Sequence, residues 1–286
     1  MHLTLEQART LHLAAQGLAA PPRKPATRVD LARCIRRMQL LQIDTIHVVN
    51  RSPYLVLFAR LGAYPTEWLE QLLARGTIFE TWAHEACFAP IEDWALHRGY
   101  NAERAHWGTR NAQRAYRSHR THMHTLLEHI RTQGAVKSSD FERTDGQGGG
   151  WWGWKSEKRW LEAWFALGEL MVARRENFQR VYDLTERVHP TAARLPLPDA
   201  QAAQAQMTER AVKALGITQA RWVNDYFRTK PKLKDRDLAP LLDAGVIERV
   251  QIENWREPAY VHREHLALAR KVLRGALAAT HTTLLS

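Results

Sequence analysis

One pattern recurs three times along this 286-residue chain and most strongly limits its fold. In each copy a helical pattern ends at a glycine, Gly76, Gly168 or Gly245, and a β-rich stretch with a polar middle follows. Glycine stops a helix well at this position because it adopts the left-handed C-cap conformation without strain. The β-rich stretch is typical of a two-stranded hairpin. The sequence therefore predicts units made of helices followed by a β-wing.

Helical patterns precede each glycine, and three helices followed by a wing make the winged-helix plan, a helix-turn-helix variant. The first unit also contains a short apolar segment between its second and third helices. In the second unit, the capping box Ser139-Asp140-Phe141-Glu142 opens the middle helix. The predicted helices span 5–18, 29–41 and 65–75 in the first unit, 125–133 and 156–167 around that box in the second, and 209–215, 219–227 and 236–244 in the third.

These units predict a mainly α-helical protein with small β-wings, an α+β fold of three tandem winged-helix modules. The glycines lie 92 residues (168 − 76) and 77 residues (245 − 168) apart, which is too far and too uneven for a solenoid. Two connectors are expected, a polar stretch at 100–120 and a Pro- and Ala-rich stretch at 189–206. The predicted modules span 1–100, 101–190 and 206–286.

The charge balance favours a polyanionic partner, since 41 Lys and Arg against 30 Asp and Glu give a net charge of +11. General solubility explains a basic composition equally well, so charge alone leaves both open. An anionic membrane is a weaker candidate, because no basic amphipathic helix or transmembrane-length apolar run occurs. Cys34 and Cys87 have apolar neighbours and fit buried thiols in a reducing compartment. With no secretory signal pattern, we expect a cytoplasmic, nucleoid-associated protein.

The run LLQIDTIHVVNRSPYLVLFARLG contains an amide and a carboxylate two positions apart, in Gln42-Ile43-Asp44. In an extended segment Gln42 and Asp44 would project to one side and share a cleft, while Ile43 would turn away. On a helix the same spacing would place them on nearly opposite faces. The alternative is a helix end followed by a turn in which Asp44 accepts hydrogen bonds from backbone amides. The triplet alone leaves both interpretations open.

Basic residues gather where the second module would meet a nucleic acid. Lys155, Lys158 and Arg159 lie at the start of its third helix, the end that enters a groove in winged-helix proteins. Arg174 and Arg175 lie in the following wing. We predict that these five residues contact nucleic acid, with a solvated basic face as the alternative. The preceding GQGGGWWGW segment lacks the Gly-Lys-Ser/Thr of a nucleotide-binding loop and is predicted to be a flexible turn.

The sequence gives little support for a metal site or for a catalytic nucleophile. His119, His122 and His124 have no Cys or carboxylate at ligand spacing, and their neighbours are basic. The chain contains no HExxH metalloprotease motif and no G-x-S-x-G nucleophile elbow. We therefore expect no metal and no other cofactor.

Long motifs across nearly the whole chain resemble the YcaQ/AlkZ-type winged-helix DNA glycosylases. They are LLQIDTIHVVNRSPYLVLFARLGAY, WAHEACF, WWGWKSEKRWLE, RRENFQRVYDLTERV and the ending ATHTTLLS. The resemblance implies that Gln42 and Asp44 are the catalytic pair, in the form of the motif that ends in aspartate. That form implies removal of cationic N7-alkylated guanine from double-stranded DNA, including the unhooking of interstrand crosslinks.

Physical chemistry agrees with that role. A guanine alkylated at N7 leaves as a neutral base, so the remaining task is to stabilise an oxocarbenium-like sugar and activate water. The Asp44 carboxylate would do both, and the Gln42 amide would orient the water or the sugar. No lysine lies in the motif to form a Schiff base, so we expect a monofunctional glycosylase. We also expect it to be a monomer. The alternative is a non-catalytic tandem winged-helix DNA-binding protein, such as a transcription regulator.

Around the motif, four residues are candidates for contacts with the DNA backbone or the cleft: Arg51, Tyr54, Arg60 and His84. For Tyr54 and Arg60 the alternative is that they brace the first module, and for His84 that it is a packed histidine. Members of the family continue past the position of Ser286 into a β-barrel that bears a DNA-contacting hairpin. We expect this sequence, whether a fragment or a natural short form, to lack that part and to grip DNA more weakly.

Overall fold

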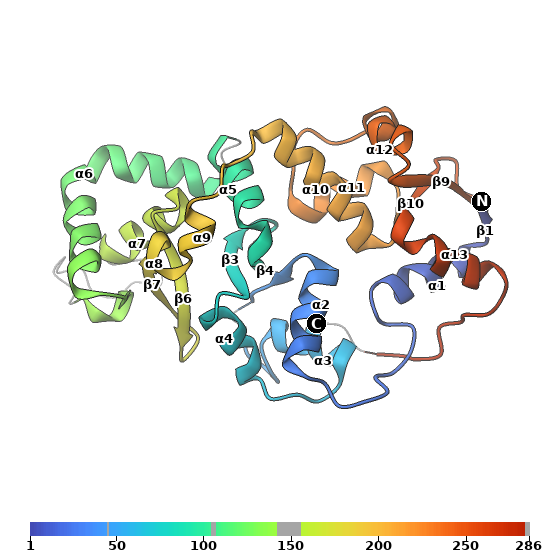
Figure 1. The fold of residues 1–286 in the computed structure, drawn as a ribbon, viewed down its shortest axis with the longest axis horizontal. Helices are drawn as coiled ribbons and strands as arrows, with labels where there is room; N and C mark the ends of the chain where they lie inside the picture. Colours follow the sequence, from blue (N-terminus) through green and yellow to red (C-terminus); the bar gives the residue numbers. More distant parts are fainter. Residues whose placement is uncertain (45, 104–106, 142–155, 284–286) are drawn as a thin grey trace. The chain divides into compact units, whose positions relative to one another are not determined.

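The computed structural model describes residues 1–44, 46–103, 107–141 and 156–283. In this part the chain is mainly helical with three small sheets, which confirms the predicted α+β class (Figure 1). The chain forms two compact units: unit 1 comprises Met1–Trp68, Ala83–Ala89 and Ala202–Ser286, and unit 2 comprises Leu69–Trp82 and Pro90–Gln201. None of the described helices is long and apolar enough to span a membrane.

The three predicted glycine ends are confirmed. Gly76, Gly168 and Gly245 have φ angles of +65°, +87° and +62°. Each glycine amide donates to the carbonyl three residues earlier, and the next amide donates to the carbonyl five residues earlier, which is the Schellman motif. A strand starts two residues after each glycine: β3 (Ile78–Trp82), β6 (Leu170–Glu176) and β9 (Ile247–Ile252). The count of three winged-helix modules stays a prediction.

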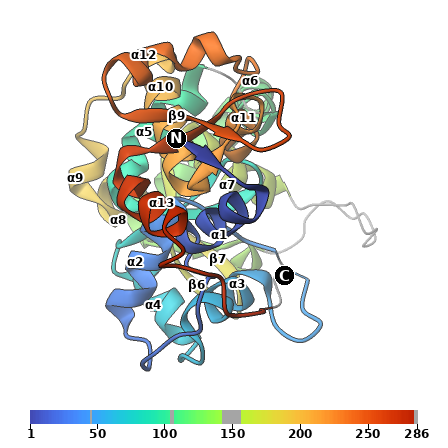
Figure 2. The ribbon, with the colours of Figure 1, turned by 90° about the vertical axis from the view of Figure 1, so that its right-hand side faces the viewer.

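Unit 1 joins the two ends of the chain in one hydrophobic core. Strand β1 (His2–Leu3) pairs in parallel with β9, giving the sheet order β1-β9-β10-β8. Leu3 and Leu11 pack with Val250 and Val272, and Figure 2 shows α1 beside α13. The elements of unit 1 are α1 (Leu5–Ala15), α2 (Arg28–Met38), β2 (Leu41–Gln42), α3 (Ser52–Leu61), β8 (Ile217–Thr218), α11 (Ala220–Phe227), α12 (Ala239–Asp243), β10 (Ala259–His262) and α13 (Leu266–Leu273).

Local capping signals explain where the first two helices of unit 1 begin. Thr4 accepts a hydrogen bond from the Gln7 amide, and the Gln7 side chain accepts one from the Thr4 amide. Thr27 and Asp30 form the same reciprocal pair at the start of α2. Each capping box satisfies two amides that the first turn leaves without helical partners.

Unit 2 contains a three-stranded sheet, in which β7 (Gln179–Leu184) lies between β5 (Val136–Lys137) and β6, and two packed helices, α6 (Trp107–Gln133) and α7 (Ser156–Leu167). The indole nitrogen of the buried Trp164 in α7 donates to the Met123 carbonyl of α6 at 2.8 Å. Helix α4 (Glu67–Ala74), β4 (Ala86–Pro90) and α10 (Ala200–Leu215) cross the boundaries of the units. The remaining elements are α5 (Trp94–Glu103), α8 (Thr185–Val188) and α9 (Pro190–Ala193).

Both predicted connectors are wrong in part. Most of 100–120 lies in helices α5 and α6, and α10 begins inside 189–206. The run AQAAQAQ at the start of α10 consists of strong helix formers, which outweigh the nearby prolines. In α6, buried Ala112, Met123 and Ile130 form the apolar face, but arginines and histidines between them hide that period. The predicted short helix at the Ser139 capping box is a 3₁₀ turn, Ser138–Asp140.

A buried ion cluster holds the core of unit 2. The fully buried Glu80 of β3 accepts hydrogen bonds from Arg175 at 2.5 and 2.9 Å and from Arg180 at 2.7 Å. Arg180 also donates to both carboxylate oxygens of Glu162 in α7 at 2.9 Å, and Tyr182 donates to Glu162 at 2.9 Å. The cluster therefore ties one strand from the first part of the chain to the β6–β7 hairpin and to α7.

We predict that Glu80→Gln lowers the free energy of unfolding by about 3–5 kcal/mol at pH 7, because it removes the negative charge that neutralises the buried Arg175 and one of the two carboxylates that bind Arg180. Burial by itself raises the pKa of Glu80, but Arg180 and Arg175 outweigh it and hold that pKa below the ordinary value. The stabilisation is therefore complete above the unfolded-state pKa and is lost as pH falls through the lowered one. Urea unfolding at several pH values should show the two proteins converging in acid; a constant difference would contradict this account.

Gly168 carries a second constraint besides its backbone angle. A Cβ there would lie 2.2 Å from the Arg98 guanidinium, which donates to the Ala166 carbonyl at 2.9 Å and to the Leu167 carbonyl at the end of α7. We predict that Gly168→Ala destabilises the protein more than Gly134→Ala, whose φ is +95° but whose Cβ would have no neighbour within 4 Å. Left-handed strain costs both variants about 1–2 kcal/mol, and displacement of Arg98 adds about 1–3 kcal/mol. Urea unfolding of both variants tests the difference.

Candidate active site

The Gln42-Ile43-Asp44 segment is extended, not helical. Gln42 pairs with Cys87 of β4, and the Ile43 amide continues the pairing by donating to the Ala86 carbonyl at 2.7 Å. Ile43 is buried, Gln42 is exposed and Asp44 is half-buried. This alternation places Gln42 and Asp44 on the same, accessible side of the segment, about 7 Å apart along the chain.

Asp44 also accepts a hydrogen bond from a backbone amide, as the alternative interpretation of the motif expected. Its Oδ1 accepts a hydrogen bond from the Ile46 amide at 2.9 Å, a local turn that restricts rotation of the carboxylate. Within the described part of the chain, Oδ2 has no hydrogen-bond partner and the Gln42 amide has none. The exposed Gln42 and the half-buried Asp44 therefore lie on the accessible side of a single short segment.

A strained corner leads into this segment. Gln39, directly after α2, has φ +64° and ψ −35°, a sparsely populated conformation for a residue with a side chain. Its buried side chain holds the corner from two sides: Nε2 donates to the Arg36 carbonyl at 2.5 Å, and Oε1 accepts from Arg210 of α10 at 3.1 Å. The Tyr226 hydroxyl of α11 donates to the Met38 carbonyl just before it. Tertiary contacts thus set the direction in which β2 leaves the helix.

The structure corrects two of the four predicted contacts near the motif. Tyr54 is buried in the core at 7% exposure, so its ring cannot meet DNA. The Arg60 guanidinium donates to the Gln16 and Val56 carbonyls at 3.1 and 3.0 Å, and burial lowers its pKa. Both residues brace unit 1, as their alternative role expected: the Tyr54 ring is packed in the core, and Arg60 binds backbone carbonyls.

Arg51 and His84 remain predicted DNA contacts. Arg51 is the half-buried N-cap residue of α3, and its amide donates to the Asn50 side chain at 2.8 Å. His84 lies in the turn just before β4, the strand that pairs with β2. Its Nδ1 is buried and has no hydrogen-bond partner among the described residues. Such an atom calls for a partner from water or a ligand.

The predicted basic residues of unit 2 lie in different environments. Arg175 is buried in the Glu80 cluster, so the structure corrects its assignment as a DNA contact. Arg174 is exposed but is paired with Glu176 at 2.7 Å. Lys158 is half-buried and Arg159 is exposed at the start of α7, where the prediction placed them. Lys155 lies outside the described residues.

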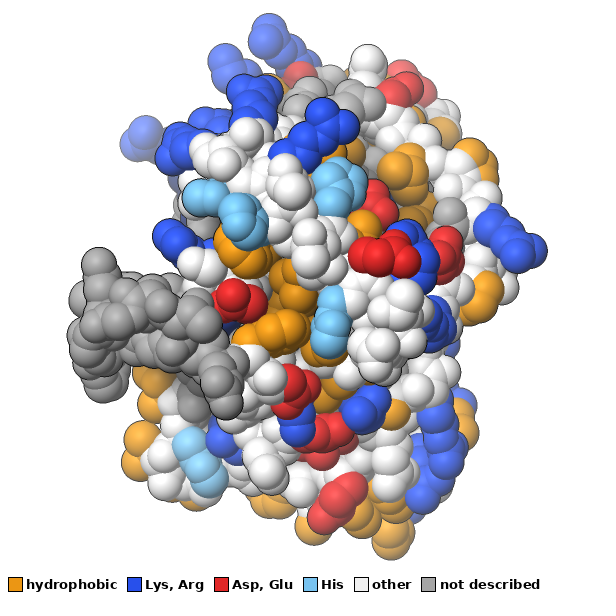
Figure 3. Space-filling view, turned by 90° about the vertical axis from the view of Figure 1, so that its left-hand side faces the viewer, with side chains coloured by type: hydrophobic (Ala, Val, Ile, Leu, Met, Phe, Trp, Pro, Cys, Tyr) orange, Lys and Arg blue, Asp and Glu red, His pale blue; other side chains and the backbone are white. Residues whose placement is uncertain are grey.

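Sequence reasoning missed a basic surface on α6. Its exposed arginines are spaced by four, three and three residues, and no Asp or Glu occurs between Glu103 and Glu128. Figure 3 faces the side of the molecule where α6 lies, and Lys and Arg side chains gather along its upper edge. The spacing of these arginines is typical of one face of a helix, but it was overlooked because residues 100–120 were predicted to be a connector. The arginines are Arg110, Arg114, Arg117 and Arg120.

The histidines of α6 are used in ring packing. His122 stacks on Trp160 with ring centres 5.5 Å apart, and His124 meets the Tyr116 hydroxyl at 3.0 Å. The residues that the structure describes contain no group of three or more His, Cys, Asp or Glu side chains arranged to hold a metal ion. Cys34 and Cys87 are both buried and neither is in a disulfide, as the sequence predicted.

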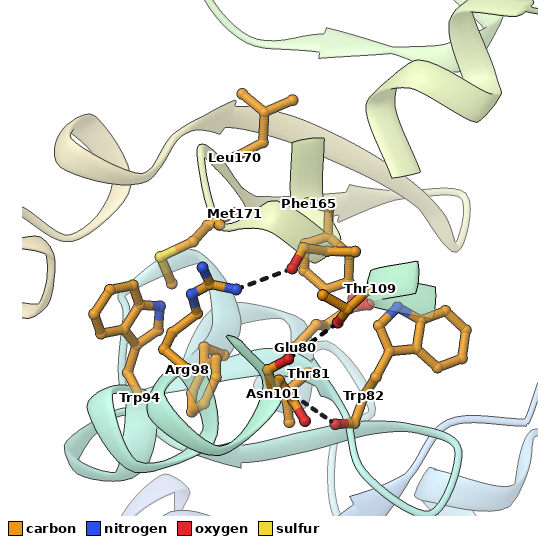
Figure 4. A pocket seen from close by; sticks show the side chains of 13 residues that line it. Glu80, Thr81, Trp82, Trp94, Arg98, Asn101, Thr109, Phe165, Leu170 and Met171 are labelled. Carbon is orange, nitrogen blue, oxygen red and sulfur yellow. Dashed lines mark hydrogen bonds between the residues drawn. The ribbon is translucent and has the colours of Figure 1, made fainter. Parts of the chain in front are cut away.

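A small pocket in unit 2, shown in Figure 4, is lined mainly by aromatic and aliphatic side chains. Its polar residues already serve the fold: Arg98 donates to the Ala166 carbonyl at 2.9 Å, and Asn101 donates to the Trp82 carbonyl at 3.0 Å. All residues that line it belong to unit 2. The pocket therefore does not include the Gln42 and Asp44 pair, which lies in unit 1.

Comparison with known proteins agrees with these features. The structure is similar to that of the Streptomyces sahachiroi DNA glycosylase AlkZ, with a TM-score of 0.64 and 16% identity over 98% of this chain and 74% of that one. At this identity the likeness shows a shared fold. A family model described as DNA glycosylase AlkZ-like matches residues 35–286, which is most of the chain and includes the extended Gln-Ile-Asp segment. The resemblance seen in the sequence is thereby confirmed, and the chain belongs to the AlkZ-like DNA glycosylase family.

Proposed function

We propose that this DNA glycosylase hydrolyses the N-glycosidic bond of cationic N7-alkylated guanine in duplex DNA, including guanines joined in interstrand crosslinks, with Asp44 and Gln42 as catalytic residues. The observation that carries the proposal is the extended Gln42-Ile43-Asp44 segment, whose two polar side chains share one accessible side. Family membership supports DNA as the substrate. The choice of lesion comes from the aspartate in the motif and from chemistry.

The carboxylate suits a reaction whose leaving group needs no protonation. An N7-alkylated guanine carries a positive charge and departs as a neutral base, leaving positive charge on the sugar. A carboxylate beside the sugar stabilises this charge and accepts a proton from the attacking water. The Asp44–Ile46 hydrogen bond holds Oδ1 in place and leaves Oδ2 for the reaction. Gln42 then orients the water or the deoxyribose from the same side.

The remaining parts of the proposal follow from this geometry. No lysine lies in the segment to form a Schiff base, so the enzyme releases the base without cutting the strand. A crosslinked base cannot leave the helix freely, so its sugar must be reached with little or no flipping. Two polar groups on an exposed strand suit such an approach better than a deep, enclosed pocket. The protein acts as a monomer, because the proposed pair comes from one segment.

We predict that Asp44→Asn lowers the rate of base release by about 10²–10⁴-fold, because it removes the proton acceptor and the charge that stabilises the sugar. Gln42→Ala should slow release less. A duplex carrying N7-methylguanine serves as substrate, with free base and alkali-labile sites measured in single-turnover experiments. Glu85→Gln, which removes an exposed carboxylate from the turn before β4, is the matched control and should keep normal activity.

Several outcomes would contradict the proposal. No release by the wild type, or equal release by wild type and Asp44→Asn, would remove Asp44 from catalysis. Binding to one particular undamaged sequence without any base release would favour a regulator instead. Strand breaks without alkali treatment would contradict the monofunctional assignment.

The strained corner at Gln39 predicts a positioning role for a residue far along the chain. Gln39→Ala and Arg210→Met should each lower the single-turnover rate by about 10–100-fold, since small displacements of reacting groups have effects of this size. The dissociation constant for lesion DNA should change little. Arg236→Met removes a charge from an 80% exposed side chain of the same unit and is the control. Equal losses in binding for Arg210→Met and Arg236→Met, with an unchanged rate, would show a charge effect only.

A further inference from the structure

The three most exposed large apolar side chains of the described chain lie in one short segment. Val48 is 88% exposed, Val49 is 84% exposed and Ile46 is 69% exposed. The segment begins two residues after Asp44. Single exposed apolar residues need no explanation, but three within four positions do. This segment, residues 46–49, is called the apolar loop below.

Both ends of the apolar loop are held in place. At its start the Ile46 amide donates to the Asp44 carboxylate at 2.9 Å. After its end, the Asn50 side chain accepts from the Arg51 amide at 2.8 Å, where helix α3 begins. Val48 and Val49 thus project from a loop whose ends are tied to the proposed catalytic carboxylate and to a helix.

β-Branched side chains suit insertion between flat surfaces. They have few rotamers, so they lose little conformational freedom when they are buried. Base pairs present wide apolar faces once a step is opened, and apolar side chains of other DNA-binding proteins enter such steps and unstack them. Full burial of a valine contributes about 1.5 kcal/mol or more. Exposed in the free protein, these side chains are available for that contact.

We propose that the apolar loop is a wedge that enters the base stack of duplex DNA next to the lesion, with Val48 and Val49 as the inserting side chains. The proposal rests on the proposed function, because it takes Asp44 as the point at which the sugar is attacked. Opening the neighbouring step widens access to the sugar while the damaged base stays near its original position. This suits a crosslinked guanine, which cannot rotate out of the helix.

Duplex DNA is the partner of the apolar loop that the structure favours. The family acts on DNA, and the loop continues directly from the proposed catalytic carboxylate. His47 lies within the loop and Arg51 follows it, whereas no Asp or Glu occurs between Asp44 and Glu67. The apolar loop itself therefore presents no carboxylate to a polyanion. A second copy of the chain or another polypeptide would bury the same side chains but would leave DNA stacking unchanged.

Fluorescence of 2-aminopurine placed beside the lesion tests the wedge, because this base is quenched when stacked and brightens when it is unstacked. A 2′-fluoro sugar at the N7-methylguanine keeps the base from being released during the measurement. Saturating wild-type protein should raise the fluorescence. The double variant Val48→Ser, Val49→Ser should lose most of that rise and slow base release from the ordinary lesion duplex by about tenfold or more.

Matched variants separate the wedge from the proposed chemistry. Val29→Ser changes a 63% exposed valine elsewhere in unit 1 and should behave like the wild type in both measurements. Asp44→Asn should keep the fluorescence rise while losing base release. If Asp44→Asn stays active, the proposed function is wrong, but the fluorescence comparison still tests the wedge independently.

Two results would overturn the wedge. One is a fluorescence rise in the Val48, Val49 double variant equal to that of the wild type, at saturating protein and with unchanged unfolding in urea. The other is a saturated wild-type complex without any rise. A concentration-dependent dimer that the double variant abolishes, together with unchanged DNA fluorescence, would assign the apolar loop to self-association instead.

Discussion

The backbone pairing between β2 and β4 is the constraint on which the candidate site depends. Ile43 donates its amide to Ala86 and buries its side chain, so the segment must stay extended. An extended backbone turns Gln42 and Asp44 to one side, whereas a helical one would have separated them. The site is therefore a property of a sheet edge, although its residues follow directly on a helix.

The position of that sheet edge depends in turn on contacts from the far end of the chain. Gln39 holds an unfavourable backbone conformation because its side chain is bonded to its own helix and to Arg210. Strain of this kind persists only where surrounding structure enforces it, and it is often found near functional sites. Some 170 residues separate the two partners, so folding of unit 1 is a precondition for a correctly placed Asp44.

Charge has two separate roles in this protein. In unit 2 Arg175 and Arg180 bind the buried Glu80, and Arg180 also binds the half-buried Glu162; these arginines serve stability, although Arg175 was predicted to contact nucleic acid. On α6 the arginines are exposed and no acidic residue lies within that stretch of helix. The net charge of +11 counts the buried, ion-paired arginines and the exposed arginines of α6 equally. Only burial and partner geometry distinguish a structural arginine from one available to a polyanion.

Local signals served well where one residue type decides the conformation. The three glycine helix ends and the strands that begin two residues later depend on short-range geometry. The connectors failed because alanine-rich and arginine-rich helices carry weak apolar periods. The parallel pairing of β1 with β9 had no local signal at all, since two residues carry no readable periodicity and their partner lies about 250 positions away.

The sequence by itself determined the class of fold, the family and the identity of the proposed catalytic pair, because these depend on residue types in fixed local order. Tertiary structure decided the rest. It showed that Asp44 is presented on an extended edge, that Tyr54 and Arg175 are buried, and that Val48 and Val49 are left exposed beside the site. Exposure and pairing depend on which distant segments cover a residue, and one-dimensional spacing does not contain that information.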